Sequence, residues 1–312
     1  RARPDPGCSN SRTLQRRILP LQDGAALKAF ISQSMEKDVM TTSTATTLVN
    51  VVASPPSGRP KAVVFDHHEY AASVILRGRP VPWDNATAYA AFFAQAQGLL
   101  RPDVALLDLN RLYGHLMTGN TRLETGMAAR SRTGFALRTL LGDDDLNRAV
   151  LDFVTVFAKT ARQPVVLRIP SPMMWLTGTH HFSGADDTSG LDADNAENAS
   201  MYVSDWLRAF AALPVAGLLL DNRTPAGASR GVHVPLEAYT PIANLAGNYR
   251  WTLGQLDDDQ ARLHGDPAVG GYIPAGFWLE SDVELPAADF YLADIPSAAS
   301  PEGVLARLET LG

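Results

Sequence analysis

Short apolar runs that end in charged residues recur along the chain, and each is followed by a segment with helical spacing of its apolar positions. Apolar runs of this length are typical of strands that are buried on both faces. Strands that alternate with helices form parallel sheets, so the charged residues at successive strand ends should emerge at one edge. The charged clusters at the ends of the four clearest runs cover residues 66–69, 108–111, 168 and 221–223.

The pattern predicts as many strands as a (β/α)8 barrel contains. The intervals from 52 to 61 and from 279 to 289 are too short for a helix, so we expect an α/β fold of the TIM-barrel type with irregularities. An open doubly wound sheet is the alternative, but no G-x-G-x-x-G or Walker A pattern supports nucleotide binding in such a sheet. The predicted strands cover 47–52, 61–66, 103–108, 164–169, 215–220, 250–256, the neighbourhood of 272–279, and 289–294.

Helical spacing predicts helices between these strands. Asp143 precedes a strongly amphipathic helix whose first turn is acidic, as the positive end of the helix dipole favours. Ser300 and Pro301 have the residue types expected at the N-cap and first turn of a closing helix. A polar loop at about 176–194 is long for a compact domain, which favours a functional role. Further predicted helices follow Asp23 and cover 84–100, 121–141, 196–212 and 235–247.

Composition narrows the classes of function. The 312-residue chain is 46% apolar and 19% charged, as is typical of a folded soluble protein. Its net charge of −6 argues against a nucleic-acid partner, which would require a basic face. No segment has the ~20 uninterrupted apolar residues of a membrane span, and none has the apolar core of a secretory signal. We therefore expect a cytoplasmic protein without a membrane partner.

The N-terminal segment differs from the rest of the chain. Residues 1–17 carry five arginines and one acidic residue. We interpret residues 1–20 as a disordered or extended arm and residues 21–312 as a single barrel domain. Cys8 is the only cysteine, so no disulfide framework and no cysteine-based metal site is expected. The sequence leaves a homodimer open.

The first candidate cluster follows the strand predicted at 61–66. His67 and His68 come directly after Asp66, and side-chain alternation allows only one of these histidines to face the barrel mouth. There it could assist proton transfer or bind a substrate carboxylate. A metal is the alternative, because zinc and iron sites combine His and carboxylate ligands from separated segments. His180 and His181 on the polar loop could complete such a site.

Asp108 ends the next predicted strand, and Arg111 and Tyr113 follow it. A carboxyl group at the end of a buried strand is partly removed from water, which favours the protonated form that a general acid needs. If Arg111 keeps the group ionised, the same two residues form a structural pair that ties the strand to its loop. The sequence alone is compatible with both interpretations.

Arg168 ends a third strand, and the bulky residues Met174 and Trp175 follow it. A guanidinium group beside an apolar wall suits a ligand with a carboxylate and a hydrophobic body. Arg111 and Arg223 at other strand ends strengthen this expectation, and an internal salt bridge of Arg168 to an aspartate is the alternative. The remaining predicted substrate contacts are Tyr113, His180, His181, Asp221 and Glu280.

Two runs of three aspartates resemble metal-binding motifs at first sight. They cover residues 143–145 and 257–259. A helix N-terminus explains the first better, and a solvated turn explains the second better. We therefore expect neither run to bind a metal, and no metal or other cofactor is predicted for the leading hypothesis.

Four segments carry a family resemblance, with the sequences DVALLD at 103–108, QPVVLRIPSP at 163–172, AGLLLD at 216–221 and YTPI at 239–242. They resemble the superfamily of uroporphyrinogen decarboxylase and cobalamin-independent methionine synthase over about residues 60–296. The resemblance implies a barrel with a site at its rim and a reaction that cleaves a C–C bond or transfers a proton. It makes Asp108 the counterpart of the decarboxylase's essential aspartate.

The departures from that superfamily also matter. The chain lacks the cysteines with which zinc-binding members activate a thiol, so zinc-thiolate transfer is not expected. Residues 66–70 stand where the decarboxylase has an arginine-rich substrate motif, so a porphyrinogen substrate is not expected either.

The leading hypothesis is a cofactor-independent, decarboxylase-like lyase that acts on a small, partly hydrophobic, carboxylated metabolite. Asp108 would be the acid/base group, assisted by Asp66, His67 or His68, and the loop at 176–194 would close over the substrate. The second hypothesis is a zinc- or iron-dependent hydrolase or C–C hydrolase. The third is a barrel that binds a small molecule without turnover.

Overall fold

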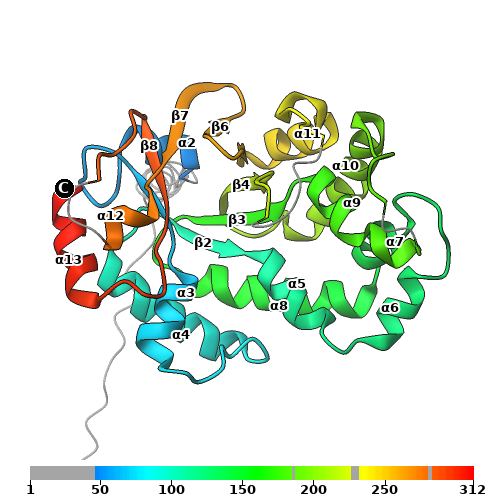
Figure 1. Cartoon of the computed structure of the whole chain (residues 1–312), viewed down its shortest axis with the longest axis horizontal. Coiled ribbons are helices and arrows are strands. Elements are labelled where there is room, and N and C mark those ends of the chain that lie inside the picture. The colour runs from blue at the N-terminus through cyan, green and yellow to red at the C-terminus, as the bar shows by residue number, and fades with distance from the viewer. Residues whose placement is uncertain (1–45, 185–186, 226–231, 280–282) are drawn as a thin grey trace, which may run out of the picture. The chain divides into compact units, whose positions relative to one another are not determined.

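The computed structural model describes residues 46–184, 187–225, 232–279 and 283–312 (Figure 1). The contacts among these residues group them in one unit, Ala45–Gly312. The predicted arm at 1–20 and the helix predicted after Asp23 lie outside the described residues.

Eight strands of the described residues form one sheet that curves into a nearly closed barrel (Figure 1). The strand order is β1-β8-β7-β6-β5-β4-β3-β2. β6 runs antiparallel to both of its neighbours, and all the other pairs are parallel. The strands are β1 Val63–Asp66, β2 Ala105–Asp108, β3 Val165–Pro170, β4 Val215–Asp221, β5 Thr252–Leu256, β6 Ala261–Leu263, β7 Asp266–Tyr272 and β8 Phe290–Asp294.

The prediction of an irregular TIM-type barrel is confirmed, although two strands differ from those predicted. Residues 47–52 form helix α2 (Leu48–Ala53) instead of a strand, and the Thr47 side chain caps it by accepting the N–H of Asn50. The strand expected near 272–279 ends at Tyr272, and helix α12 (Ala275–Leu279) follows. The missing strands are supplied by the β6–β7 hairpin, whose turn uses Gly265 at a φ of +73°.

The barrel interior is closed at one end by α2. Leu48 and Val51 of this helix are fully buried in a cluster with inward-facing strand residues such as Val64 and Leu219. A Cβ atom at Gly217 would lie 3.0 Å from the Leu48 side chain, so glycine lets the helix approach β4 closely. Alternation along the strands then leaves their last inward-facing residues at the opposite, carboxyl-terminal mouth.

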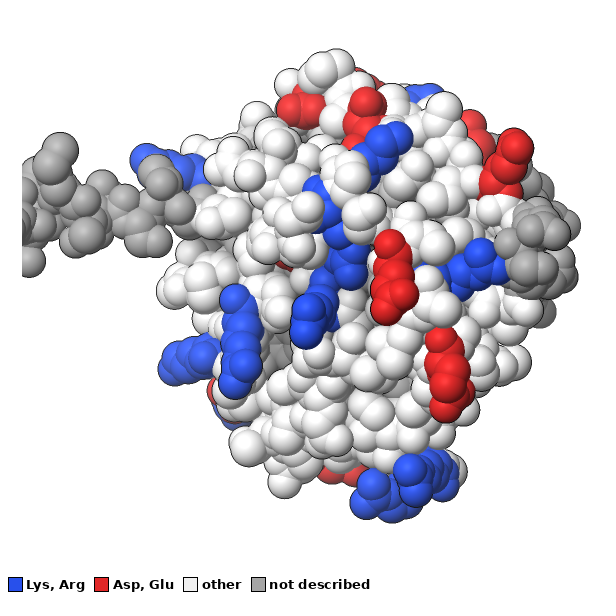
Figure 2. All heavy atoms as spheres, turned by 90° about the vertical axis from the view of Figure 1, so that its left-hand side faces the viewer, with Lys and Arg blue, Asp and Glu red and all other residues white. Residues whose placement is uncertain are grey.

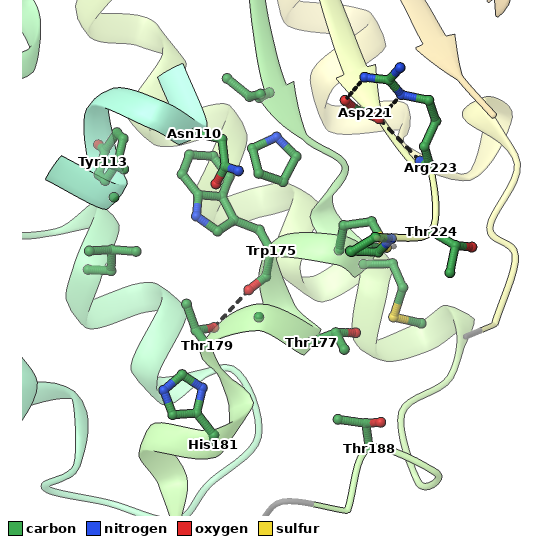
Figure 3. A pocket seen from close by; sticks show the side chains of 18 of the residues that line it. Asn110, Tyr113, Trp175, Thr177, Thr179, His181, Thr188, Asp221, Arg223 and Thr224 are labelled. Atoms are coloured by element: carbon green, nitrogen blue, oxygen red, sulfur yellow. Dashed lines mark hydrogen bonds and ion pairs between the residues drawn. The ribbon is translucent and has the colours of Figure 1, made fainter. Parts of the chain in front are cut away.

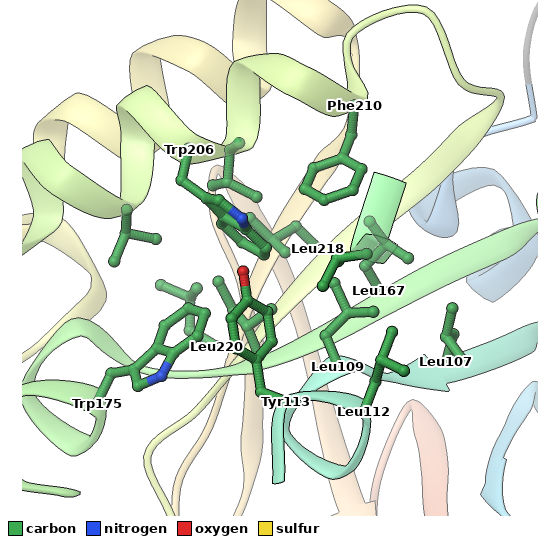
Figure 4. Packing of buried hydrophobic residues seen from close by; sticks show 14 of the residues in the cluster. Leu107, Leu109, Leu112, Tyr113, Leu167, Trp175, Trp206, Phe210, Leu218 and Leu220 are labelled. Atoms are coloured by element: carbon green, nitrogen blue, oxygen red, sulfur yellow. The ribbon is translucent and has the colours of Figure 1, made fainter. Parts of the chain in front are cut away.

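The outward-facing strand residues pack against helices. In Figure 4 the rings of Tyr113, Trp175 and Trp206 meet edge to face above leucines of β2, β3 and β4. This packing fixes α5, α9 and α10 against the sheet and thereby places Tyr113 and Trp175 beside the mouth. The longer helices are α4 Ala86–Leu100, α5 Leu109–Met117, α6 Thr121–Met127, α7 Phe135–Leu141, α8 Asp144–Thr160, α9 Pro172–His180, α10 Ala193–Leu207, α11 Thr240–Tyr249 and α13 Pro301–Thr310.

The N-caps predicted at Asp143 and Ser300 are present in the structure. Asp143 caps α8 by accepting the N–H of Leu146, and Ser300 caps α13 with Pro301 in its first turn. The loop predicted at 176–194 begins later than expected, because α9 continues to His180. Ser171 caps that helix by accepting the N–H of Met174, so its first turn is held directly after β3.

Asp103 joins the two ends of the sheet. Its buried carboxylate accepts the N–H of Val63 in β1 at 2.9 Å and the N–H of Ser57 at 2.8 Å. The backbone N–H of Asp103 donates to the carbonyl of Val63 at 3.4 Å, and Arg59 Nη1 lies 3.8 Å from the carboxylate. The side chain therefore satisfies backbone donors at the seam between β1 and β2.

The surface in Figure 2 carries scattered acidic and basic side chains among mostly uncharged residues. In the described part of the chain, no helix combines the length and apolarity needed to cross a bilayer.

Replacing Asp103 with asparagine should destabilise the barrel. The amide keeps one acceptor oxygen but leaves one of the two backbone N–H groups without a good partner, which costs about 2 kcal/mol in a buried site. Urea unfolding followed by circular dichroism measures this change, and Asp205→Asn on exposed α10 is the matched control. A D103N protein as stable as the control would show that the carboxylate does not hold the seam.

Candidate active site

Acidic and basic side chains from several strand ends meet at the carboxyl-terminal mouth of the barrel. Arg168 from β3 lies at the centre, and its Nη2 donates to Asp66 of β1 and, at 2.7 Å, to Asp108 of β2. Its Nε lies 3.8 Å from Asp221 of β4, and its Nη1 lies 4.0 Å from Asp294 of β8. The expected convergence of Asp66, Asp108, Arg168 and Asp221 is therefore present in the structure.

Two further arginines complete this cluster. Arg111, from the first turn of α5, donates through Nη1 to both carboxylate oxygens of Asp66 at 2.9 Å. Arg223 donates to Asp221 through Nε at 2.9 Å and Nη2 at 2.7 Å, and to Asp294 through Nη1 at 2.9 Å. All three arginines at the mouth are thus paired with carboxylates of the barrel itself.

The pKa values in the cluster follow from burial and charge together. Burial alone would raise the pKa of Asp66, but Arg168 and Arg111 outweigh it and hold that pKa well below its ordinary range. Burial opposes the charge of Arg168, yet Asp66, Asp108 and Asp221 raise its pKa well above the usual value. Arg223 behaves in the same way beside Asp221. The interior charges are therefore fixed by one another.

A cavity of about 850 Å³ opens beside this cluster (Figure 3). Its polar floor includes Asp108, Arg168, Asp221 and Arg223. Its wall is mostly apolar and is supplied by α5, α9 and neighbouring loops, with several threonines among the apolar side chains. The wall includes Asn110, Tyr113, Met117, Met173, Met174, Trp175, Thr177, Thr179, His181, Phe182, Thr188, Leu191, Thr224, Val232 and Asp258.

The predicted site residues fall into three groups. The first group lines the cavity and comprises Asp108, Arg168, Asp221, Arg223, Tyr113, Met174, Trp175 and His181. Asp66 and Arg111 lie behind this lining and reach it only through their ion pairs with Arg168 and Asp108. His67, His68 and His180 are not among the lining residues. Glu280 lies outside the described residues.

His67 points away from the barrel mouth, as alternation after Asp66 requires. It is 2% exposed, lies against the Phe93 ring at 4.6 Å, and its Nε2 is 3.0 Å from the Gln97 side-chain nitrogen. Burial lowers the pKa of His67 to about 4, although the charge of Asp66 opposes this shift. The expectation that His67 assists proton transfer in the cavity is not supported by this position.

His68 is also directed elsewhere. It begins helix α3 (His68–Ala71) and stacks on Trp83 with ring centres 5.2 Å apart. Burial, followed by the charge of Arg111, lowers its pKa. His181 lines the cavity and packs on the ring of Phe182 at 4.0 Å. In the described part of the chain, no three His, Cys, Asp or Glu side chains are grouped so that they could hold a metal ion.

The sequence did not reveal a second polar network next to the cavity. Asp257 is 4% exposed, and its Oδ1 accepts from Asn222 Nδ2 at 2.9 Å and Gln255 Nε2 at 3.0 Å. His233 Nε2 lies 3.2 Å from the same oxygen. Asn222 in turn accepts from the Ser171 hydroxyl, which connects the network to the start of α9.

This network corrects the interpretation of the run as a solvated turn for Asp257, whereas Asp258 and Asp259 are exposed. Only the position of Asp257 directly after the apolar strand at 252–256 could have indicated burial. Gln255 belongs to that strand, but Asn222 and His233 come from distant parts of the chain, and such pairings are decided by tertiary contacts.

No family model, no curated protein and no solved structure matches this chain.

The buried neutral state of His67 predicts a pH dependence of stability. Its pKa is about 4 in the folded chain, against an ordinary value of 6.5, so the unfolded chain binds the proton first as the pH falls. Stability should therefore decrease from about pH 6.5 towards about pH 4, by about 3 kcal/mol in all. Asp66 adds little loss in this window, because its contribution begins to be lost only where the carboxyl of the unfolded chain binds a proton, near its ordinary pKa of 3.8. The loss then continues at lower pH.

Urea unfolding at several pH values measures this slope. His67→Gln should flatten it, whereas His264→Gln, at an exposed position, should leave it unchanged. An unaltered slope in H67Q would assign the pH dependence to other groups.

Proposed function

We propose that this protein is a cofactor-independent lyase that uses acid/base catalysis at the carboxyl-terminal mouth of its barrel. The observation that carries the proposal is the contact between Asp108 and Arg168 on the floor of the cavity, 2.7 Å apart. A carboxylate beside a fixed positive charge combines a proton acceptor with a group that stabilises a developing oxyanion.

The reaction that fits these two groups is the cleavage of a C–C bond in a β-hydroxy carbonyl compound. Asp108 accepts the proton of the hydroxyl group, and that carbon becomes a carbonyl as its C–C bond breaks. The electron pair of the broken bond forms an enolate, whose oxygen accepts a hydrogen bond from Arg168. The proton then returns from Asp108 to the enolate carbon, which releases two carbonyl products.

The environment of Arg168 supports this role. It is 4% exposed, and its hydrogen bonds to described residues all leave from Nη2. Its Nη1 lies 4.0 Å from Asp294 and makes no hydrogen bond among the described residues. A guanidinium group has five N–H donors, so Arg168 keeps donors for a ligand oxygen. Its position is fixed by four aspartates before any ligand binds, which is the preorganisation that oxyanion stabilisation requires.

The apolar wall of the cavity supports a partly hydrophobic substrate. Tyr113, Met174 and Trp175 offer the surface that a partly hydrophobic metabolite needs. The sequence motifs that resemble the uroporphyrinogen decarboxylase superfamily agree with this proposal, because the resemblance implies C–C bond cleavage or proton transfer, with Asp108 as the counterpart of the essential aspartate.

The replacement Asp108→Asn should abolish turnover and leave the fold intact. An amide cannot accept the substrate proton, and loss of a positioned acid/base group typically lowers the rate by about 10²- to 10⁴-fold. Turnover is measured as carbonyl release from a panel of medium-chain β-hydroxy ketones, with far-UV circular dichroism as the check of folding. Asp145→Asn, at an exposed ion pair on α8, is the control. Full activity of D108N would remove Asp108 from the mechanism.

A barrel that binds a small molecule without turnover is the second candidate. The complete pairing of Arg111, Arg168 and Arg223 with barrel carboxylates favours it, because such pairing is also what a purely structural cluster would have. Binding of β-hydroxy ketones without carbonyl release, in the protein that carries Asp108, would support this candidate.

The metal-dependent hydrolase remains a prediction that element analysis can test. Stoichiometric zinc or iron in protein purified without chelator, together with activity that a chelator removes, would favour it over the lyase.

A further inference from the structure

We propose that the cavity selects an uncharged ligand, with a hydroxyl or hydroxy-carbonyl head on the ionic floor and an apolar body on the Met and Trp wall. This inference rests on the proposed site and specifies its substrate class. It departs from the expectation of a carboxylated ligand that the number of strand-end arginines suggested.

The first step concerns the charges that a ligand head would meet. Each arginine of the floor already has its counter-ion, since Arg168 pairs with Asp66 and Asp108, and Arg223 pairs with Asp221. Arg111 pairs with Asp66 as well. A ligand carboxylate would have to leave water and displace one of these aspartates from its arginine. Burying a charge without a free counter-ion is costly, so anions are disfavoured.

The second step concerns cations. An ammonium head would need a carboxylate, but Asp108 and Asp221 are each shared with an arginine that lines the same floor. Arg168 and Arg223 would repel the ammonium group at short range. Each carboxylate of the floor is therefore already paired with an arginine, although the floor is densely ionic. Asp258, the other carboxylate of the lining, accepts hydrogen bonds from the backbone N–H and the hydroxyl of Thr224.

The third step concerns what the floor does offer. Arg168 lines the cavity, and its Nη1, which lies 4.0 Å from Asp294, donates no hydrogen bond to the described residues. The side chain of Asp108 is 13% exposed and that of Asp221 is 23% exposed, so both carboxylates can still accept from a ligand. A hydroxyl group both donates and accepts, so it can satisfy Arg168 and one aspartate without a net charge.

The wall of the cavity is suited to an uncharged, apolar ligand body. Met117, Met173, Phe182 and Leu191 add apolar surface, and the threonines of the wall add hydrogen-bonding groups that carry no charge. Thr179 uses its hydroxyl to donate to the Trp175 carbonyl at 2.9 Å, as Figure 3 shows. A cavity of about 850 Å³ can enclose a metabolite with a medium-length apolar chain.

The test uses three probes with the same eight-carbon body: 1,2-octanediol, octanoate and octylammonium. Their dissociation constants for the full chain are measured by isothermal titration calorimetry at neutral pH. The diol should bind at least about tenfold more tightly than either charged probe, since each 1.4 kcal/mol of desolvation cost is tenfold in affinity. Equal or tighter binding of a charged probe, or no binding of the diol, would overturn the proposal.

Two substitutions test whether the ion pairs set the selectivity: one removes a negative charge from the floor and the other removes a positive charge. Asp221→Asn frees the Nε and Nη2 donors of Arg223, so the affinity for octanoate should rise at least about tenfold relative to the diol. Arg223→Gln removes the arginine that pairs with Asp221, so the affinity for octylammonium should rise at least about tenfold relative to the diol. Asp205→Asn, on exposed α10, should change no ratio. Unchanged ratios in both floor variants would show that the ion pairs do not set the selectivity.

These measurements are independent of turnover. A diol preference together with full activity of D108N would preserve the ligand class and reject the proposed reaction. Loss of activity in D108N together with tight octanoate binding would preserve the proposed reaction and reject the ligand class.

Discussion

The structure depends on the burial of one arginine at the mouth of the barrel. Arg168 is 4% exposed and faces Asp66, Asp108, Asp221 and Asp294, each from a different strand. A buried guanidinium group needs carboxylates around it, and Arg168 in turn helps to hold the pKa of Asp66 well below its ordinary range. The charges thus form one unit that ties β1, β2, β3, β4 and β8 together at the end where a ligand would bind.

The two ends of the barrel have opposite chemistry for a physical reason. At the amino-terminal end, α2 inserts Leu48 and Val51 among apolar strand residues, and Gly217 provides the room for it. This end contributes to the core of the barrel. At the carboxyl-terminal end, the charged layer cannot be covered by apolar side chains without losing its hydrogen bonds, so it remains at the floor of a cavity. Asp103 holds the seam between β1 and β2 at their amino-terminal starts.

The outcome at the candidate site shows which inferences a sequence supports. Strand ends predicted which residues would meet, and Asp108, Arg168, Asp221 and Arg223 line one cavity. Alternation after Asp66 turns His67 away from the mouth, but the direction of His68 was not predictable, because it depends on where β1 ends and α3 begins. The partners of the arginines were not predictable either. Counting arginines indicated an anionic ligand, whereas the ion pairs leave none of those arginines without a counter-ion.

The sequence by itself determined the α/β class, the strand-end positions of the charged residues and the helix caps at Asp143 and Ser300, because these follow from local periodicity and local hydrogen bonding. Tertiary structure decided that residues 47–52 form a helix and that 261–272 form a hairpin, since each segment packs against strands distant in the chain. It also decided the burial of Asp257 and the pairing of every arginine at the mouth. Charge pairing depends on distances between strands, and only the closed barrel sets these distances.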